Sequence, residues 1–318
     1  MSKEGIKMNR AELVFKAVDV LGYPTQNILR FKDVVCVKDI LYGHGKRQKA
    51  DLYYRTEILN DGKNHPLVVY FHGGGFIKGD KNYRKSICEF YANEGYFVYN
   101  INYEMPPEAV CPEMFYGCVK GVNSITKLFE KYNIDENKIV LTGDSSGAFI
   151  CSYVAALKFD DALREAVECE EVKININGLM LMCGIYDLEV LLKGSSLMGV
   201  IPQTARMVFD FDLKKDFSNI KEYKYYDYIS PAHFVNDKWC SSFICWADDD
   251  IVCQNQGEPM AEKLKACVPY FDSYNVSGLQ NNHCFHLNFG MKNKPAMECM
   301  NKSLEFLEKI TNEETVTA

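Results

Sequence analysis

One serine stands in a pattern that could make it a nucleophile. Ser145 is the middle residue of Gly143-Asp144-Ser145-Ser146-Gly147, which follows the apolar run Lys138–Thr142 and opens a helical pattern. A nucleophile elbow needs this context, because its sharp turn lifts the serine Oγ above a sheet and its glycines let strand and helix approach closely. A glycine-bracketed turn with a serine helix cap has the same sequence, so the motif alone leaves both interpretations open.

A glycine run supplies a second chemical group. His72-Gly73-Gly74-Gly75-Phe76 comes directly after the five-residue apolar run Leu67–Phe71. Without side chains, the backbone N–H groups of glycines can face a ligand, and such donors can stabilise an oxyanion. A flexible connector is the alternative. A phosphate loop is excluded, because no lysine follows the last glycine and no G-x-G-x-x-G register fits.

An acid and a histidine complete the set. Asp248, Asp249 and Asp250 follow the apolar run Ser242–Ala247, and His283 comes soon after a late strand pattern. Taken alone, three aspartates can form a solvated turn or bind a cation, and a single histidine is more often structural than catalytic. Their order along the chain is Ser, then Asp, then His, as in the α/β-hydrolase arrangement. That order favours a catalytic triad.

Apolar runs bounded by glycine or polar turns alternate with helical patterns after about residue 30. Such runs suit strands buried on both faces of a parallel sheet, and the alternation predicts one doubly wound α/β structure. Besides the runs named above, the predicted strands are Phe31–Val37, Ala50–Tyr54, Tyr96–Tyr103, Gly178–Cys183 and Tyr270–Val276. The predicted helices are Pro112–Tyr132, Ser146–Leu157, Glu258–Cys267 and Pro295–Ile310.

Two segments do not fit this alternation. Residues 1–30 precede the sheet and contain a helical stretch near Ala11–Leu21, and residues 186–228 form a long insertion without strand signals. Insertions of this kind are often lids. The chemical motifs extend from residue 72 to residue 283, so one sheet must gather them. We therefore expect a single domain over 1–318, with a cap formed by about 1–30 and 186–228.

Composition narrows the class of protein. The chain has 318 residues, a net charge of −7, 47% hydrophobic and 25% charged residues, which excludes a disordered chain, a collagen-like repeat and a coiled-coil rod. The acidic balance argues against nucleic-acid binding, and no apolar run is long enough for membrane insertion. The thirteen cysteines lack metal-ligand spacing and suit reduced, buried packing residues. Together with the lack of a signal-peptide pattern, they predict a cytoplasmic protein.

The motifs together resemble those of the hormone-sensitive-lipase-like carboxylesterase family, over roughly residues 60–310. The resemblance rests on His72–Phe76, Gly143–Gly147, the segment Asn102–Glu108 and Ser230-Pro231. It implies an α/β-hydrolase fold with an eight-stranded, mostly parallel sheet flanked by helices, and a helical cap. The chain departs from the family pattern at four positions beside these motifs, which are Glu104, Pro106, Ala148 and Trp246.

The resemblance also implies the role of each matching residue. Ser145 would be the nucleophile, and the N–H groups of Gly74, Gly75 and Ser146 would form the oxyanion hole. The family acid stands three residues before a valine, which selects Asp249, and its His-x-Phe pattern selects His283 over His286. The candidates for the lining of an apolar substrate pocket are Phe76, Met198, Met207, Phe209 and Phe211, of which the last four could equally be cap core.

These residues predict a serine carboxylesterase that cleaves small esters through a Ser-His-Asp triad without a metal or cofactor, and the resemblance implies short acyl chains. Its expected partner is the small-molecule ester, and a homodimer is compatible with the sequence. The triad does not separate an esterase from an amidase, formamidase or peptidase on the same fold. A non-catalytic small-molecule receptor is a further alternative, although such a protein would be expected to lose a triad member. A cysteine-based redox or metal protein is disfavoured by the cysteine spacing.

Overall fold

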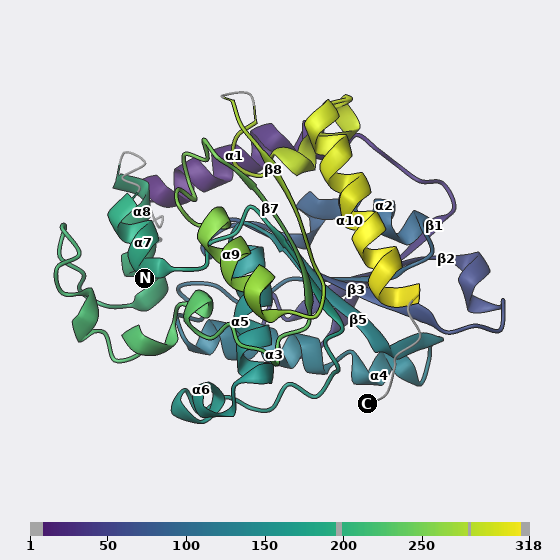
Figure 1. Cartoon of the computed structure of the whole chain (residues 1–318), viewed down its shortest axis with the longest axis horizontal. Helices are drawn as coiled ribbons and strands as arrows, with labels where there is room; N and C mark the ends of the chain where they lie inside the picture. Colours follow the sequence, from purple (N-terminus) through teal and green to yellow (C-terminus); the bar gives the residue numbers. More distant parts are fainter. Residues whose placement is uncertain (1–8, 195–198, 279–280, 313–318) are drawn as a thin grey trace, which may run out of the picture.

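A single eight-stranded sheet forms the centre of the molecule (Figure 1). The computed structural model describes residues 9–194, 199–278 and 281–312. The strand order is β1-β2-β4-β3-β5-β6-β7-β8, in which β2 is antiparallel to both neighbours and β3 to β8 are parallel to one another. The strands are Val34–Leu41, Lys49–Arg55, His65–Phe71, Phe97–Ile101, Ile134–Asp144, Gly178–Met182, Ser241–Ala247 and Phe271–Val276. Every strand predicted from the sequence is therefore present.

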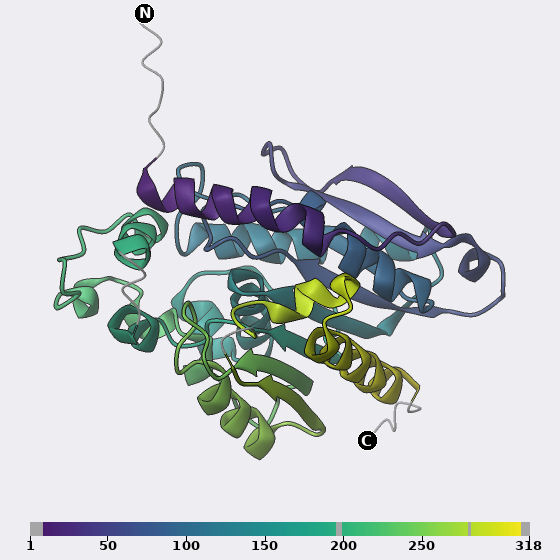
Figure 2. The same ribbon diagram turned by 90° about the horizontal axis from the view of Figure 1, so that it is seen from above.

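Helices cover both faces of this sheet (Figures 1 and 2). On one face lie α2 (Lys85–Asn93) and α10 (Lys294–Asn312). On the other lie α3 (Glu113–Asn123), α4 (Thr126–Phe129), α5 (Ser146–Phe159), α6 (Asp161–Ala166) and α9 (Gly257–Cys267). The predicted helix Pro112–Tyr132 is wrong as one element, because the chain turns at Ser124 and Ile125 between α3 and α4.

The continuous apolar runs follow from burial on both faces. In β3, Leu67, Val69 and Phe71 enter one core while Val68 and Tyr70 enter the other, since successive strand side chains point to opposite faces. The central helix α5 is buried from Ser146 through Leu157, which explains why it lacks a polar face.

The two segments outside the strand–helix alternation meet at one end of the sheet. Helix α1 (Arg10–Gln26) begins at the Asn9 capping box and packs against α8 (Val200–Phe209). Figure 1 shows α8 and α7 (Leu188–Gly194) beside the start of α1. The described part of residues 186–228 contains helices and 3₁₀ turns but no strand, as its sequence predicts. Both segments border the carboxyl ends of the parallel strands, where ligands bind in sheets of this type.

Candidate active site

Ser145 lies on a strained turn between β5 and α5. Its backbone dihedrals are φ 54° and ψ −120°, a conformation that non-glycine residues rarely adopt and that clusters at functional sites. The neighbouring glycines are required by close packing. A Cβ on Gly147 would lie 2.0 Å from the Phe71 carbonyl oxygen, and one on Gly143 would lie 2.6 Å from the same atom. The sequence pattern thus produces the sharp strand-to-helix turn of a nucleophile elbow.

His283 connects this serine to an acid. Its Nε2 lies 2.9 Å from Ser145 Oγ, and its Nδ1 lies 2.7 Å from Asp250 Oδ2. The selection of Asp249 from the sequence is wrong in this geometry. Asp249 is exposed and accepts a hydrogen bond from the Gly278 N–H instead.

A tight turn explains why Asp250 faces the histidine. Asp250 Oδ1 accepts hydrogen bonds from the backbone N–H groups of Val252 at 2.7 Å and Cys253 at 2.8 Å. These two bonds fix the carboxylate so that its other oxygen points at His283. The family pattern, in which the acid stands three residues before a valine, takes no account of this turn. Because both position 249 and position 250 are aspartates, the sequence does not show which of them faces the histidine.

The acid and the histidine shift each other's proton affinity. Burial opposes charge on Asp250, but His283 and the two N–H donors outweigh it and hold the pKa of Asp250 below its usual value. Burial also opposes charge on His283, but the Asp250 carboxylate outweighs it and raises the pKa of His283. A carboxylate placed this way stabilises an imidazolium.

The glycine run packs directly against the elbow. A Cβ on Gly73 would lie 2.8 Å from the Asp144 carbonyl oxygen and 3.1 Å from Ser145 Cβ, so no side chain fits between the two loops. Gly74 and Gly75 have φ values of 131° and 62°, which favour glycine. Gly75 and Ser145 line the same pocket, and Ser146 is the first residue of α5. The structure therefore places Gly75 and Ser146 beside Ser145, and Gly74 precedes Gly75 in the same loop.

Arg47, which no sequence motif indicates, stabilises the glycine loop through several hydrogen bonds. Its Nη2 donates to the Gly79 carbonyl at 2.8 Å and lies 3.3 Å from His72 Nε2, while its Nε donates to the Tyr103 carbonyl at 2.9 Å. Burial and the nearby Arg47 charge lower the pKa of His72 to about 4, so that histidine is neutral. Glu104 accepts from the Arg47 backbone N–H and thereby holds the loop that carries the arginine.

A buried ion pair lies under the elbow. The Arg84 guanidinium donates to both carboxylate oxygens of Asp144, at 2.7 and 2.6 Å, and Tyr70 donates to the same carboxylate at 2.9 Å. Burial opposes charge on Asp144, but Arg84 outweighs it and holds the pKa of Asp144 at about 2. The pair joins the N-cap residue of α2 to the residue immediately before Ser145. Its partners are 60 residues apart in the sequence, so no local pattern indicates it.

An apolar pocket opens over Ser145. It contains about 500 Å³ of unfilled space, part of it open to solvent, and Phe15 of α1 forms one wall. Phe15 packs on the glycine loop, since a Cβ on Gly75 would lie 2.3 Å from its ring. Apart from Phe15, Gly75 and Ser145, the lining residues are Phe76, Ile185, Leu188, Leu191, Leu192, Ile201, Thr204, Ala205, Val208, Phe209 and Val252. Helices α1, α7 and α8 thus supply most of the wall.

The predicted lining residues divide into three groups. Phe76 and Phe209 line the pocket. Met198 lies outside the described residues. Met207 and Phe211 are wrong as lining residues, because they lie on other sides of the cap. Met207 contacts Asn9 and lines a separate surface hollow, and Phe211 packs on Tyr223.

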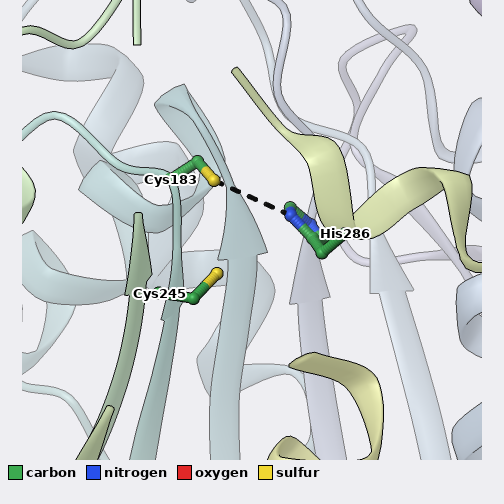
Figure 3. Close-up of side chains that lie close together, drawn as sticks. All are labelled: Cys183, Cys245 and His286. Atoms are coloured by element: carbon green, nitrogen blue, oxygen red, sulfur yellow. Dashed lines mark hydrogen bonds between the residues drawn. The ribbon is translucent and has the colours of Figure 1, made fainter. Parts of the chain in front are cut away.

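The cysteines are free thiols at all thirteen positions. Figure 3 shows Cys183, Cys245 and His286, which come from three separate parts of the chain and lie close together beneath the strand ends. Cys183 Sγ lies 3.9 Å from His286 Nδ1. Burial lowers the pKa of His286 to about 3 and raises the pKa of Cys245. At neutral pH these groups are uncharged packing residues. Cys284, which adjoins His283, is also buried, 4.0 Å from Asp144 Oδ2.

A family model described as BD-FAE matches residues 51–264 of the chain. The protein therefore belongs to the BD-FAE family, and its sheet, elbow and crossover helices define an α/β-hydrolase fold. Among solved structures, esterase B from Lactobacillus rhamnosis has a TM-score of 0.79 at 17% identity and covers 96% of this chain and 97% of its own. A bacterial heroin esterase has a TM-score of 0.70 at 17% identity and covers 95% and 92%.

The curated proteins that are similar in sequence match a smaller share of this chain than the solved structures do. Tuliposide A-converting enzyme 2, chloroplastic, from Tulipa gesneriana is 30% identical over 144 residues, which are 42% of this chain and 37% of that protein. Probable carboxylesterase 6 from Arabidopsis thaliana is 31% identical over 134 residues, which are 39% of this chain and 37% of that protein. The match thus spans little more than a third of these relatives. None of the helices among the described residues is long and apolar enough to cross a membrane.

Proposed function

We propose that this protein is a serine hydrolase that cleaves small carboxylic esters. The observation that carries the proposal is the alignment of Ser145 Oγ, His283 and Asp250 through contacts of 2.9 and 2.7 Å, at the base of an apolar pocket. The shared fold with esterases and the similarity to a probable carboxylesterase support it.

In the first step, Ser145 Oγ attacks the ester carbonyl carbon while His283 Nε2 takes the hydroxyl proton. Asp250 holds the His283 Nδ1–H and stabilises the imidazolium, without taking the proton itself. The N–H groups of Gly74, Gly75 and Ser146 bind the oxyanion of the tetrahedral intermediate. His283 then gives its proton to the leaving alcohol, and an acyl-enzyme remains on Ser145.

In the second step, His283 takes a proton from water, and the resulting nucleophile attacks the acyl-enzyme. Collapse of the second tetrahedral intermediate releases the carboxylic acid and restores Ser145. Both steps use the same donors and the same base. Each requires the glycine loop to stay fixed relative to Ser145, which is the arrangement that Arg47 and the packing of Gly73 maintain.

The pocket favours an acyl group that is apolar and short. Its lining is aliphatic and aromatic, and Phe15 narrows the space above Gly75. Burial of apolar surface contributes roughly 0.8 kcal/mol per methylene, so affinity rises with chain length until the wall is reached. Lipase 2 from a Moraxella strain is among the similar proteins, and one solved structure of esterase B is that of a complex with a tributyrin phosphonate.

The direct test is hydrolysis of aryl esters of graded acyl length by the wild type and by Ser145→Ala. We expect the variant to lose on the order of 10⁶ in turnover. A fluorophosphonate should label Ser145 in the wild type, as located by peptide mass spectrometry. Near wild-type turnover of the variant would overturn the proposal. Faster cleavage of an anilide than of its matching ester would assign an amidase on the same fold instead.

A further inference from the structure

Cys253 lies beside the acid–histidine pair. A ring nitrogen of His283, a carboxylate oxygen of Asp250 and Cys253 Sγ all lie within 4.8 Å of one another. Cys253 is held there by its own N–H bond to Asp250 Oδ1 at 2.8 Å. The three side chains therefore form a nitrogen, oxygen and sulfur ligand set inside the site, and the proposed mechanism does not use the sulfur.

A second pocket reaches one member of this ligand set, Cys253, from outside. Cys253 lines a polar surface pocket of about 660 Å³ of unfilled space, which is separate from the apolar pocket over Ser145. Its other lining residues include the acids Asp248 and Glu258 and the amides of Asn255 and Gln256. A cavity lined by acids and amides attracts cations. A metal ion thus has a polar route to Cys253 that avoids the substrate pocket.

We propose that Asp250, Cys253 and His283 form an inhibitory site for a thiophilic divalent cation, with Zn²⁺ as the representative ion. Zinc binds carboxylate oxygen, imidazole nitrogen and thiolate sulfur at about 2.0 to 2.3 Å, so ligand atoms around one ion lie roughly 3 to 4 Å apart. Cys253 and its partners are within about an ångström of that spacing. The 2.7 Å contact between Asp250 and His283 must open by a few tenths of an ångström to admit the ion.

Coordination of the ion by His283 would stop catalysis because it changes which ring nitrogen of the histidine carries the proton. In the resting site Nδ1 carries the proton that bonds to Asp250, and Nε2 is free to accept the Ser145 proton. When the ion binds Nδ1, that proton moves to Nε2, and the Cys253 thiol releases its proton to solvent. No electrons are transferred. A histidine protonated at Nε2 cannot take the Ser145 proton, so hydrolysis stops until the ion leaves.

The inhibition experiment rests on the proposed ester hydrolysis and compares each variant with its own metal-free activity. We expect Zn²⁺ to inhibit the wild type reversibly, with recovery on adding EDTA. Cys253→Ala should raise the half-inhibitory Zn²⁺ concentration by about 10-fold or more. Cys183→Ala is the matched control, because Cys183 belongs to the other cluster that could hold a metal. An unchanged value in Cys253→Ala, or an equal rise in Cys183→Ala, would overturn the proposal.

A binding measurement separates this inference from the proposed activity. Co²⁺ added to the Ser145→Ala protein should produce a thiolate-to-cobalt charge-transfer band, and the band should disappear when Cys253→Ala is added to that variant. This result needs no turnover, so it stands even if the ester hydrolysis fails. A band that persists without Cys253 would place the ion elsewhere and refute the site.

Discussion

Asp250 Oδ2 lies 2.7 Å from His283 Nδ1, and both residues are held by loops that follow neighbouring parallel strands. The adjacent Asp249 turns outward to the Gly278 N–H. One residue of register therefore decides which carboxylate orients the histidine. This relationship yields a sharp comparison between two neighbouring aspartates.

Asp250→Asn should lower turnover of an aryl ester by about 10⁴, because the amide favours the wrong histidine tautomer. Asp249→Asn should lower it by less than about 10-fold, since that side chain is exposed and accepts a hydrogen bond from the Gly278 N–H. Steady-state kinetics of the two purified variants provide the measurement. A larger loss in Asp249→Asn would show that the acid was assigned wrongly.

Arg47 should act by positioning the glycine loop. Arg47→Met removes the bonds to Gly79 and Tyr103, and a displaced oxyanion hole can cost about 100-fold in kcat with little change in KM. Arg47→Lys should recover part of this loss. Arg164→Met, which removes an ion pair with the exposed Asp161, is the control. If kcat stays constant and only thermal stability falls in Arg47→Met, the arginine is structural.

Phe15 should limit acyl length. Phe15→Ala enlarges the pocket above Gly75, so the ratio of kcat/KM for an octanoyl ester to that for an acetyl ester should rise by about 10-fold. Met207→Ala is a matched cap variant outside this pocket and should leave the ratio unchanged. Equal ratios in Phe15→Ala and the wild type would count against the position of the acyl group.

Two buried histidines should make the fold sensitive to acid. Burial lowers the pKa of His72 to about 4 and that of His286 to about 3, whereas both are near 6.5 when unfolded. Below pH 6.5 the unfolded state binds the protons and the native state does not. Stability therefore falls as pH falls from about 6.5 toward 4, by about 1.4 kcal/mol per pH unit for each histidine.

The measurement is the free energy of unfolding in urea at pH 7, 6 and 5. Asp19, whose pKa burial raises to about 6, acts in the opposite direction, so the test compares slopes between proteins. His286→Gln should reduce the slope by about 1.4 kcal/mol per pH unit. His65→Gln, at a histidine that pairs with Asp61 near the surface, should change it little. An unaltered slope in His286→Gln would contradict the prediction.

Local sequence patterns predicted the strands and most helices well, because burial of a segment leaves a recognisable pattern of apolar residues. The strands around Val69 and Leu141 are buried on both faces, so they read as uninterrupted apolar runs. The elbow was predictable for a similar reason, since Gly143 and Gly147 leave no room for a Cβ. The cytoplasmic location and the homodimer expected from the sequence stay predictions.

Contacts between segments that are distant in the chain could not be predicted from the sequence. Arg84 and Asp144 are 60 residues apart, and Arg47 and His72 are 25 apart, so neither pair produces a periodic or local signal. The choice between Asp249 and Asp250 failed for a different reason. It depends on which carboxylate accepts the turn N–H groups of Val252 and Cys253, a matter of backbone geometry that two identical neighbours do not reveal.

The pocket wall formed by α1 is separate in the chain from the groups proposed to react. The groups proposed to perform the reaction follow strands of the sheet, whereas Phe15 stands on a helix that precedes every strand and reaches the glycine loop through its side chain and the Glu12–Lys78 ion pair. Substitutions on the inner side of this helix can alter substrate choice while leaving the reacting atoms in place. For directed evolution, α1 is accordingly a segment in which new specificities can be sought while the residues proposed to react are left unchanged.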